Sequence, residues 1–196
     1  MYKRQHEDHF NPAVFALADR KADIQFLLGN DFHLTPHNLT KWQLSPEIAA
    51  KCRRCGKHGT FTPLPGVTVE TFPSTDEGVA WMVTVNGQSI FHAGDLNWWH
   101  WAEEDLAWNR NMEANFKRYT EPLRGRRVDL AMLPLDSRLK MDGYLGPNYF
   151  LNLMEVRRFL PMHQWEDFAF TDEFLSAYPQ FLSLIHISEP TRLKLI

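Results

Sequence analysis

The chain is poor in cysteine. Only Cys52 and Cys55 occur among its 196 residues, and they form a single Cys-x-x-Cys pair. A structural zinc knuckle would need two further ligands, and His58 offers only one. We therefore expect two free thiols in a loop of a cytoplasmic protein rather than a metal knuckle.

The chain also lacks long apolar runs and an excess of positive charge. No run approaches the roughly 20 apolar residues that a membrane-spanning helix requires, so we expect no membrane partner. Lys and Arg number 21 against 24 Asp and Glu, which gives a net charge of −3. Binding of duplex nucleic acid relies on Lys and Arg to neutralise phosphates. The charge balance therefore argues against nucleic acid and leaves a small-molecule substrate as the expected partner.

The hydrophobic pattern indicates one domain with antiparallel strands first and strand–helix alternation afterwards. Asn86-Gly87 is a strong hairpin signal because both residues accept positive φ angles. Strands are expected at 23–28, 60–63, 67–72, 79–85, 88–92, 128–133 and 159–162. Helices are expected at 12–20, in two short pieces within 35–53 broken at Ser45-Pro46, and at 103–120, 148–158 and 171–178.

Imidazole and carboxylate groups gather at three places along the chain. The first is His6-Glu7-Asp8-His9, and the others are Asp95 and His163, each just after an expected strand. Zinc accepts His nitrogen and carboxylate oxygen at about 2.0–2.2 Å. Adjacent ligands cannot lie on a strand, where neighbouring side chains face opposite ways, so Asp8 and His9 are expected in a tight loop.

These stretches resemble the metallo-β-lactamase-fold hydrolase superfamily, whose first signature reads His-x-His-x-Asp-His followed by a helix. The matching residues are, in chain order, His6, Asp8, His9, Asp95 and His163. Arg4 stands where the first His of the signature would fall. The resemblance spreads over residues 6–168 and implies an α+β protein with an αββα sandwich.

The resemblance also implies a ligand set for each of two metal ions. One ion would be held by Asp8, His9, Asp95 and His163. The other would use His6, Asp95, the missing first His and a middle ligand. Many members place a His at that middle position, but residues 72–78 contain none. Asp76 could replace it, Thr75 could hold a water, or the site could bind one metal firmly.

The chemistry implied is metal-dependent hydrolysis. A metal-bound hydroxide would attack an ester, lactone, phosphodiester or amide, with Asp8 as the catalytic residue that orients it. Di-iron members carry Glu where this chain has His6, which favours zinc, in two ions, over redox chemistry. Manganese and iron remain open. The alternative function is a non-catalytic metal-binding scaffold of the same fold, suggested by the absent middle His.

Other side chains fall near the expected site without an assigned role. His92 is expected to support a ligand or to lie in the core. Asp136 follows the strand at 128–133, so it could line the pocket or cap a helix. A tryptophan cluster after Asp95 could form an aromatic wall or simply pack a helix on the sheet, and it comprises Trp98, Trp99, Trp101 and Trp108.

The two chain ends read as translations of a transposase adapter used in sequencing libraries. We therefore expect residues 1–5 and 182–196 to be non-native tails that make few contacts with the core. Residues 6–181 are then a hydrolase domain fragment, resembling bacterial hydrolases and truncated at its N-terminus. Such a fragment should expose an apolar face of its sheet and an unpaired strand edge.

Overall fold

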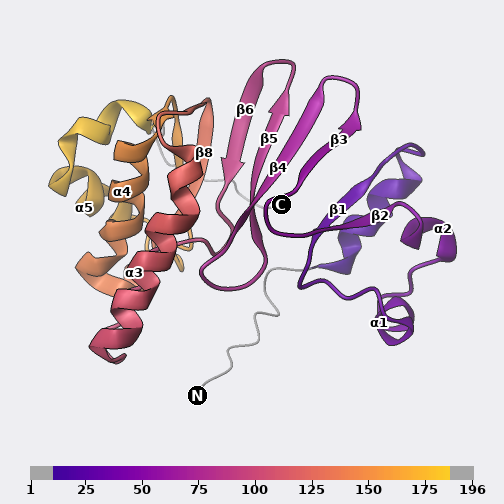
Figure 1. Cartoon of the computed structure of the whole chain (residues 1–196), viewed down its shortest axis with the longest axis horizontal. Helices are drawn as coiled ribbons and strands as arrows, with labels where there is room; N and C mark the ends of the chain where they lie inside the picture. The colour runs from indigo at the N-terminus through magenta and orange to yellow at the C-terminus, as the bar shows by residue number, and fades with distance from the viewer. Residues whose placement is uncertain (1–10, 186–196) are drawn as a thin grey trace, which may run out of the picture. The chain divides into compact units, whose positions relative to one another are not determined.

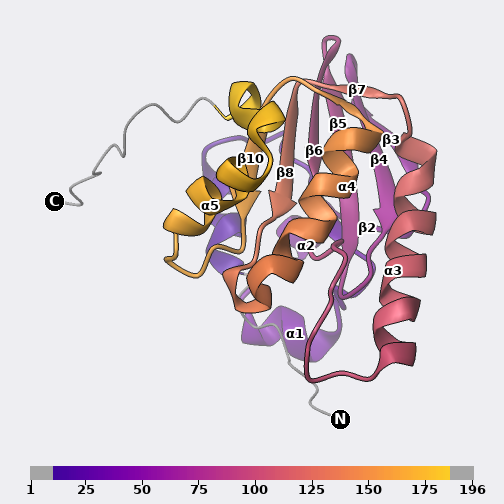
Figure 2. The ribbon, with the colours of Figure 1, turned by 90° about the vertical axis from the view of Figure 1, so that its left-hand side faces the viewer.

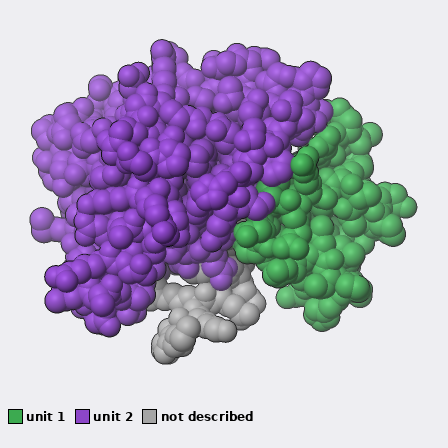
Figure 3. Space-filling view, viewed as in Figure 1, with its two compact units in different colours: residues 1–55 green, residues 56–196 purple. Residues whose placement is uncertain are grey.

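The computed structural model describes residues 11–185. The chain divides into two compact units, residues 1–55 and residues 56–196 (Figure 3). Each unit has its own sheet: β1 pairs with β2 in the first, and the second holds a sheet of six strands (Figure 1). None of the described helices is long and apolar enough to cross a membrane.

The first unit contains short elements, and each of its described helices begins after a polar cap. Its elements are η2 (Pro12–Asp19), β1 (Phe26–Gly29), α1 (Pro36–Lys41), α2 (Pro46–Ala49) and β2 (Cys52–Cys55). The side chains of Asn11, Thr35 and Ser45 accept hydrogen bonds from the first turns of η2, α1 and α2. A proline follows each cap, where its fixed φ suits a helix start.

The cysteine pair lies on a strand, so its expected placement in a loop is wrong. Cys52 and Cys55 bound β2, whose pairing with β1 is parallel. The extended backbone separates the two thiols and buries Cys55, and both cysteines are free, as predicted.

The second unit is built on a mixed sheet whose strand order is β10-β8-β6-β5-β4-β3. The strands are β3 (Thr60–Leu64), β4 (Val67–Pro73), β5 (Val79–Val85), β6 (Gln88–His92), β8 (Leu130–Pro134) and β10 (Phe159–Met162). Pairing is antiparallel from β3 to β6 and parallel from β6 through β8 to β10. Asn86 and Gly87 have φ angles of 50° and 82°, which confirms the predicted hairpin.

Helices follow the sheet strands along the chain. The remaining elements of this unit are α3 (Leu106–Thr120), η3 (Glu121–Leu123), β7 (Arg127–Val128), η4 (Ser137–Tyr144), α4 (Leu145–Leu153), β9 (Glu155–Val156), α5 (Ala169–Ala177) and η5 (Pro179–Leu184). The predicted helix at 148–158 is wrong in its second half, because residues 155–156 pair with β7 as a strand. Thr171 lies inside α5 and hydrogen-bonds Gln164, so it is not the predicted cap.

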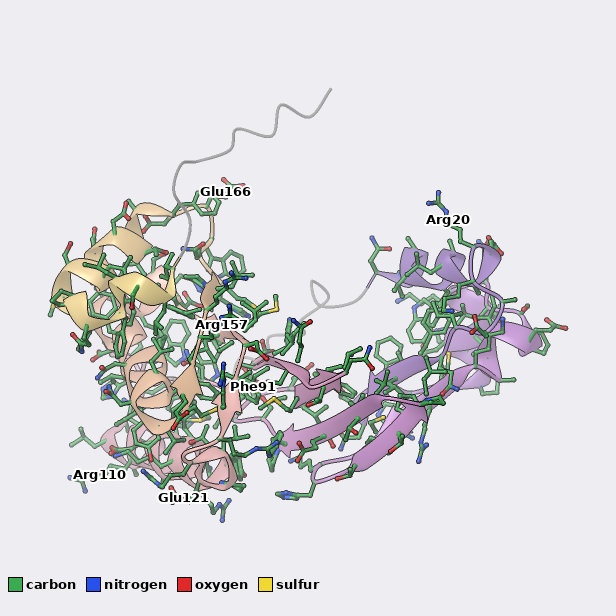
Figure 4. All side chains as sticks on the ribbon, turned by 90° about the horizontal axis from the view of Figure 1, so that it is seen from above. Arg20, Phe91, Arg110, Glu121, Arg157 and Glu166 are labelled. Carbon is green, nitrogen blue, oxygen red and sulfur yellow. The ribbon has the colours of Figure 1, made fainter. Side chains whose placement is uncertain are left out.

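The core lies between one face of the sheet and helices α3, α4 and α5 (Figure 2). Phe91 of β6 is fully buried and stacks on Phe150 of α4 at 4.8 Å between ring centroids. Figure 4 places Phe91 in the interior, while Arg110 and Glu121 point outward. These layers are one sheet and one helical layer of the predicted αββα sandwich.

The opposite face of the sheet is also apolar. Alternate residues of β5, β6, β8 and β10 share this face by register, and they include Trp81, Val83, Val85, Ile90, Leu130, Met132 and Leu160. Val85 and Ile90 are 42% and 44% exposed. Within residues 11–185, β3 forms one outer edge of the sheet. Apolar side chains are therefore exposed on this face, whereas truncation of the chain at its N-terminus stays a prediction.

The last described residues contact the core, although few contacts were expected there. Phe181 is buried, and Leu184 and Ile185 are partly buried against the core beside it. The prediction of few contacts is therefore wrong for Leu184 and Ile185, whereas Phe181 belongs to the predicted domain. Residues 1–5 and 186–196 lie outside the described residues, and a non-native origin of the tails stays a prediction.

Truncating Phe91 tests the position of the core. We expect Phe91→Ala to lower the free energy of unfolding by about 3–5 kcal/mol, because it leaves a cavity that the packed helices cannot fill. Ile90→Ala, one residue earlier on the other face, should cost about 1 kcal/mol or less. Urea unfolding followed by circular dichroism measures both. Equal losses for the two variants would contradict the assignment of the faces.

Candidate metal centre

The candidate centre lies where three parallel strands end. Asp95 follows β6, Asp136 follows β8 and His163 follows β10. In the parallel pairing, Met162 lies opposite Pro134, so the carboxyl ends of β8 and β10 meet at one edge. Side chains placed just after such strand ends converge outside the sheet, which is where open α/β sheets bind ligands.

Asp95 is held by a tight turn. Gly94 has a φ of 56°, and a Cβ at this position would lie 3.3 Å from the carbonyl oxygen of Val79. Glycine therefore suits this turn, because other residues rarely adopt positive φ. The Asp95 carbonyl accepts a hydrogen bond of 3.0 Å from the Trp99 indole Nε1. Its carboxylate is 5% exposed, so the turn delivers a buried acid to the strand end.

Thr75 fixes the loop that follows Asp95. Its Oγ1 donates to the carbonyl oxygen of Asn97 at 2.7 Å and accepts from the Asn97 amide at 3.0 Å. The Asp95 carbonyl lies 3.3 Å from the same hydroxyl. These bonds assign Thr75 a structural task on this loop, whereas its predicted contact with a metal-site water stays a prediction.

The three side chains form a row with His163 in the middle. His163 Nε2 lies 3.1 Å from Asp95 Oδ1, and His163 Nδ1 lies 3.7 Å from Asp136 Oδ2. Asp136 is fully buried, and the His163 side chain is 13% exposed. The predicted ligands Asp95 and His163 are thus brought together, and Asp136 stands behind the histidine.

The charges in this row stabilise each other. Burial would lower the pKa of His163, but attraction to Asp136 and Asp95 outweighs it and raises the pKa to about 9. Burial would likewise raise the pKa of Asp136, but its hydrogen bonds with Arg138 and the nearby imidazole of His163 lower it to about 2. At neutral pH and without metal, His163 is therefore a cation between two carboxylates.

Asp136 caps a helix, which is one of its two predicted roles, and it also contacts the candidate ligand His163. Its predicted place in the lining of a pocket stays a prediction. Its Oδ1 accepts from the backbone amide of Arg138 at 3.0 Å, at the start of η4. The Arg138 guanidinium donates to both carboxylate oxygens, at 2.9 Å and 3.1 Å from Nε and at 2.5 Å from Nη2. Arg138 was not among the predicted site residues, and its place here is set by these contacts with Asp136.

Aromatic rings border the row. Trp99 meets the His163 ring edge-on at 5.8 Å between centroids, and it stacks parallel to Trp101 at 6.3 Å. Trp98 instead packs on Phe116 of α3. Trp98 therefore packs a helix, as one of the predicted alternatives states, and Trp99 and Trp101 lie beside the candidate site. An aromatic wall over a metal site stays a prediction.

The other predicted site residues lie on β6, on the loop between β4 and β5, or outside the described part of the chain. His92 is exposed on β6 and its Nδ1 accepts from the Gly94 amide at 3.0 Å, which supports the turn before Asp95. A core position for His92 is therefore wrong. Asp76 is exposed on the loop between β4 and β5, and its metal role stays a prediction. His6, Asp8 and His9 lie outside the described residues.

The residues present fit a metal ion in part. Metal bonds of about 2.0–2.2 Å at tetrahedral angles place neighbouring ligand atoms about 3.3 Å apart, close to the 3.1 Å between Asp95 and His163. Metal-bound histidine commonly directs its second nitrogen to a carboxylate, as His163 does toward Asp136. Within residues 11–185, no group of three or more His, Cys, Asp or Glu is arranged to hold a metal.

The raised pKa of His163 predicts proton release on metal binding. A metal takes neutral imidazole, and His163 is protonated below a pKa of about 9 in the metal-free protein. Zinc binding at pH 8 should therefore release about one proton from this residue, and at pH 10 almost none. Calorimetry in buffers of different ionisation enthalpy measures the number. A release at pH 8 that is unchanged in His163→Gln would contradict the prediction.

Comparisons with known proteins bear on the fold. No protein-family model matches the chain, and no curated protein sequence matches it. A protein from Parabacteroides distasonis, provisionally assigned as a metal-dependent hydrolase, matches at a TM-score of 0.59 and 15% identity, over 92% of this chain and 71% of its own. A variant of the CmlA β-hydroxylase matches at 0.52 and 8% identity, over 82% of this chain and 37% of its own.

A zinc-dependent hydrolase assigned to the metallo-β-lactamase superfamily, from Thermotoga maritima, matches less well. Its TM-score is 0.41 at 17% identity, over 65% of this chain and 59% of its own. At these identities a likeness establishes the fold alone. The chain has an α+β architecture, and its fold is similar to that of the Parabacteroides distasonis protein.

Proposed function

We propose that this chain is a metal-dependent hydrolase whose centre includes Asp95 and His163. The observation that carries the proposal is the 3.1 Å approach of these two buried side chains at the ends of parallel strands. Burying an acid and a histidine together is costly unless each is paired, and such pairs gather at functional sites. The first of the structural neighbours is itself assigned to metal-dependent hydrolysis.

Asp95 and His163 would hold the metal, with His6, Asp8 and His9 as the further ligands that the sequence predicts. A divalent metal bound there supplies a water that ionises near neutral pH and a positive charge beside the attacked oxygen. We propose zinc, in two ions, because the predicted ligands are nitrogen and carboxylate oxygen; manganese and iron suit the same donors.

The chain's own residues would orient and shield this centre. Asp136 would hold the His163 ring by accepting from Nδ1, leaving Nε2 for the metal. Trp99 would keep water from the ring edge of His163. The bonds between Thr75 and Asn97 would fix the loop after Asp95. Asp8 is the proposed group that orients the attacking water and takes its proton.

The proposed substrate is a small molecule containing an ester, lactone, phosphodiester or amide bond. All four need an activated water and a charge that stabilises the developing oxyanion. The runner-up is a metal-binding scaffold without turnover, since no histidine occupies the middle-ligand segment at residues 72–78. Oxidation is a third candidate, because one structural neighbour is named a β-hydroxylase.

Substitution of the proposed ligands tests the hydrolase proposal. We expect Asp95→Asn and His163→Gln to lose zinc content and to lower kcat/KM by at least roughly 100-fold, since each removes a metal bond. Asp136→Asn should lower zinc affinity by about 10–100-fold by releasing the His163 ring. Elemental analysis and hydrolysis of a panel of esters, lactones, phosphodiesters and amides measure these effects.

The matched control is His37→Gln, because His37 is exposed on α1 in the other unit. It should keep both zinc and activity. Zinc that depends on Asp95 without any hydrolysis across the panel would instead support the scaffold. Zinc content unchanged in Asp95→Asn would refute the centre itself.

A further inference from the structure

Arg138 lies near two tryptophan rings beside the candidate metal centre. Its guanidinium carbon is 4.2 Å from the centroid of the Trp165 ring and 5.5 Å from that of Trp101. An aromatic ring close to a planar cation shields it from water and attracts it through the ring quadrupole. The guanidinium is left with its in-plane edges for hydrogen bonding.

One in-plane edge is already used. Nε and Nη2 donate to the Asp136 carboxylate, which is fully buried and therefore a fixed anchor. A guanidinium carries five N–H groups, so Nη1 still has two donors to offer. No acceptor for Nη1 occurs among residues 11–185. The Arg138 side chain is 33% exposed, so this second edge can be reached from solvent.

The second ring is presented by an unusual backbone. His163, Trp165 and Glu166 have φ angles of 60°, 49° and 65°, a conformation that costs energy in residues other than glycine. Trp165 is 53% exposed, although exposing an indole gains nothing for folding. The same short segment thus aims His163 at Asp95 and places Trp165 over Arg138.

Arg138 is linked to the proposed centre through one residue. Asp136 Oδ2 accepts from Arg138 Nη2 and lies 3.7 Å from His163 Nδ1. Trp101 over Arg138 stacks on Trp99, which contacts His163. A ligand group bound at the outer edge of the Arg138 guanidinium would therefore lie close to the proposed metal centre rather than at a remote surface.

We propose that Arg138 is a specificity-determining residue that binds an anionic group, a carboxylate or a phosphate, of the substrate, with Trp101 and Trp165 holding its plane. A planar carboxylate or a phosphate face matches two parallel N–H groups of guanidinium, and charged bonds of this kind are strong. This inference rests on the proposed hydrolase function, because it assigns the anionic group to a substrate. Binding of an anion at Arg138 can be tested without turnover.

Paired substrates test the specificity. In the zinc-loaded full chain, we compare kcat/KM for p-nitrophenyl butyrate and for mono-p-nitrophenyl succinate, which differ by a terminal carboxylate. We expect the wild type to prefer the succinate ester. Arg138→Gln should reduce the ratio of the two values by about tenfold or more, since it removes a charged bidentate contact. Using the ratio cancels any common effect of the variant on the centre.

Two further variants separate anion binding from folding. Arg138→Lys keeps the charge but loses the planar fork, so most of the preference should be lost. Trp165→Ala leaves the bonds to Asp136 in place and should weaken the preference about threefold or more. Arg118→Gln is the matched control, because Arg118 also lies over an aromatic ring, that of Tyr119. Its ratio should equal that of the wild type.

Binding of succinate itself, measured by calorimetry at equal zinc content, separates this proposal from the hydrolase proposal. Affinity at least tenfold weaker in Arg138→Gln than in Arg118→Gln supports the anion site even if neither ester is hydrolysed. Equal succinate affinity in these variants, or an unchanged substrate ratio in both Arg138→Lys and Trp165→Ala, would overturn the anion site while leaving metal-dependent hydrolysis intact.

Discussion

The parallel pairing of β6, β8 and β10 is the constraint on which the candidate site depends. Because the three strands run in the same direction, the residues that follow them emerge at one edge of the sheet. The chain places Asp95, Asp136 and His163 at these three exits. Regions far apart in the sequence therefore meet through backbone hydrogen bonding alone, before any metal or substrate contributes.

Charge alternation makes this convergence tolerable. Arg138, Asp136, His163 and Asp95 follow one another as cation, anion, cation and anion. A buried charge without a partner would cost several kcal/mol, whereas here each group has an opposite neighbour. A metal ion bound to Asp95 and His163 would replace the proton of His163. The two carboxylates would then stabilise the metal cation as they stabilise the protonated imidazole.

The sheet and its turns followed from local sequence pattern. Strands β5, β6 and β10 were predicted with their observed bounds, because alternation and the Asn86-Gly87 turn are decided by neighbouring residues. The helix at 148–158 was not, because pairing of Glu155–Val156 with β7 overrides local helical preference. Short-range pattern carries no information about that long-range contact.

The residues of the candidate site were, like the sheet, predicted only in part. Asp95 and His163 were found through their resemblance to a ligand motif, and Asp136 through its place after a strand. Arg138 and Trp165 were not found, since their roles come from a stacking arrangement between η4 and the segment after β10. Positive φ at Trp165 and Glu166 cannot be anticipated from residues that ordinarily avoid it.

A metal-bound crystal structure tests the central claim most directly. Anomalous diffraction at the zinc absorption edge from the zinc-soaked full chain would locate the ion. The account predicts a peak bonded at about 2.0–2.2 Å to Asp95 and to Nε2 of His163, with the Nδ1 of His163 facing Asp136. Zinc found at other residues, with the Asp95–His163 contact unchanged at 3.1 Å, would contradict it.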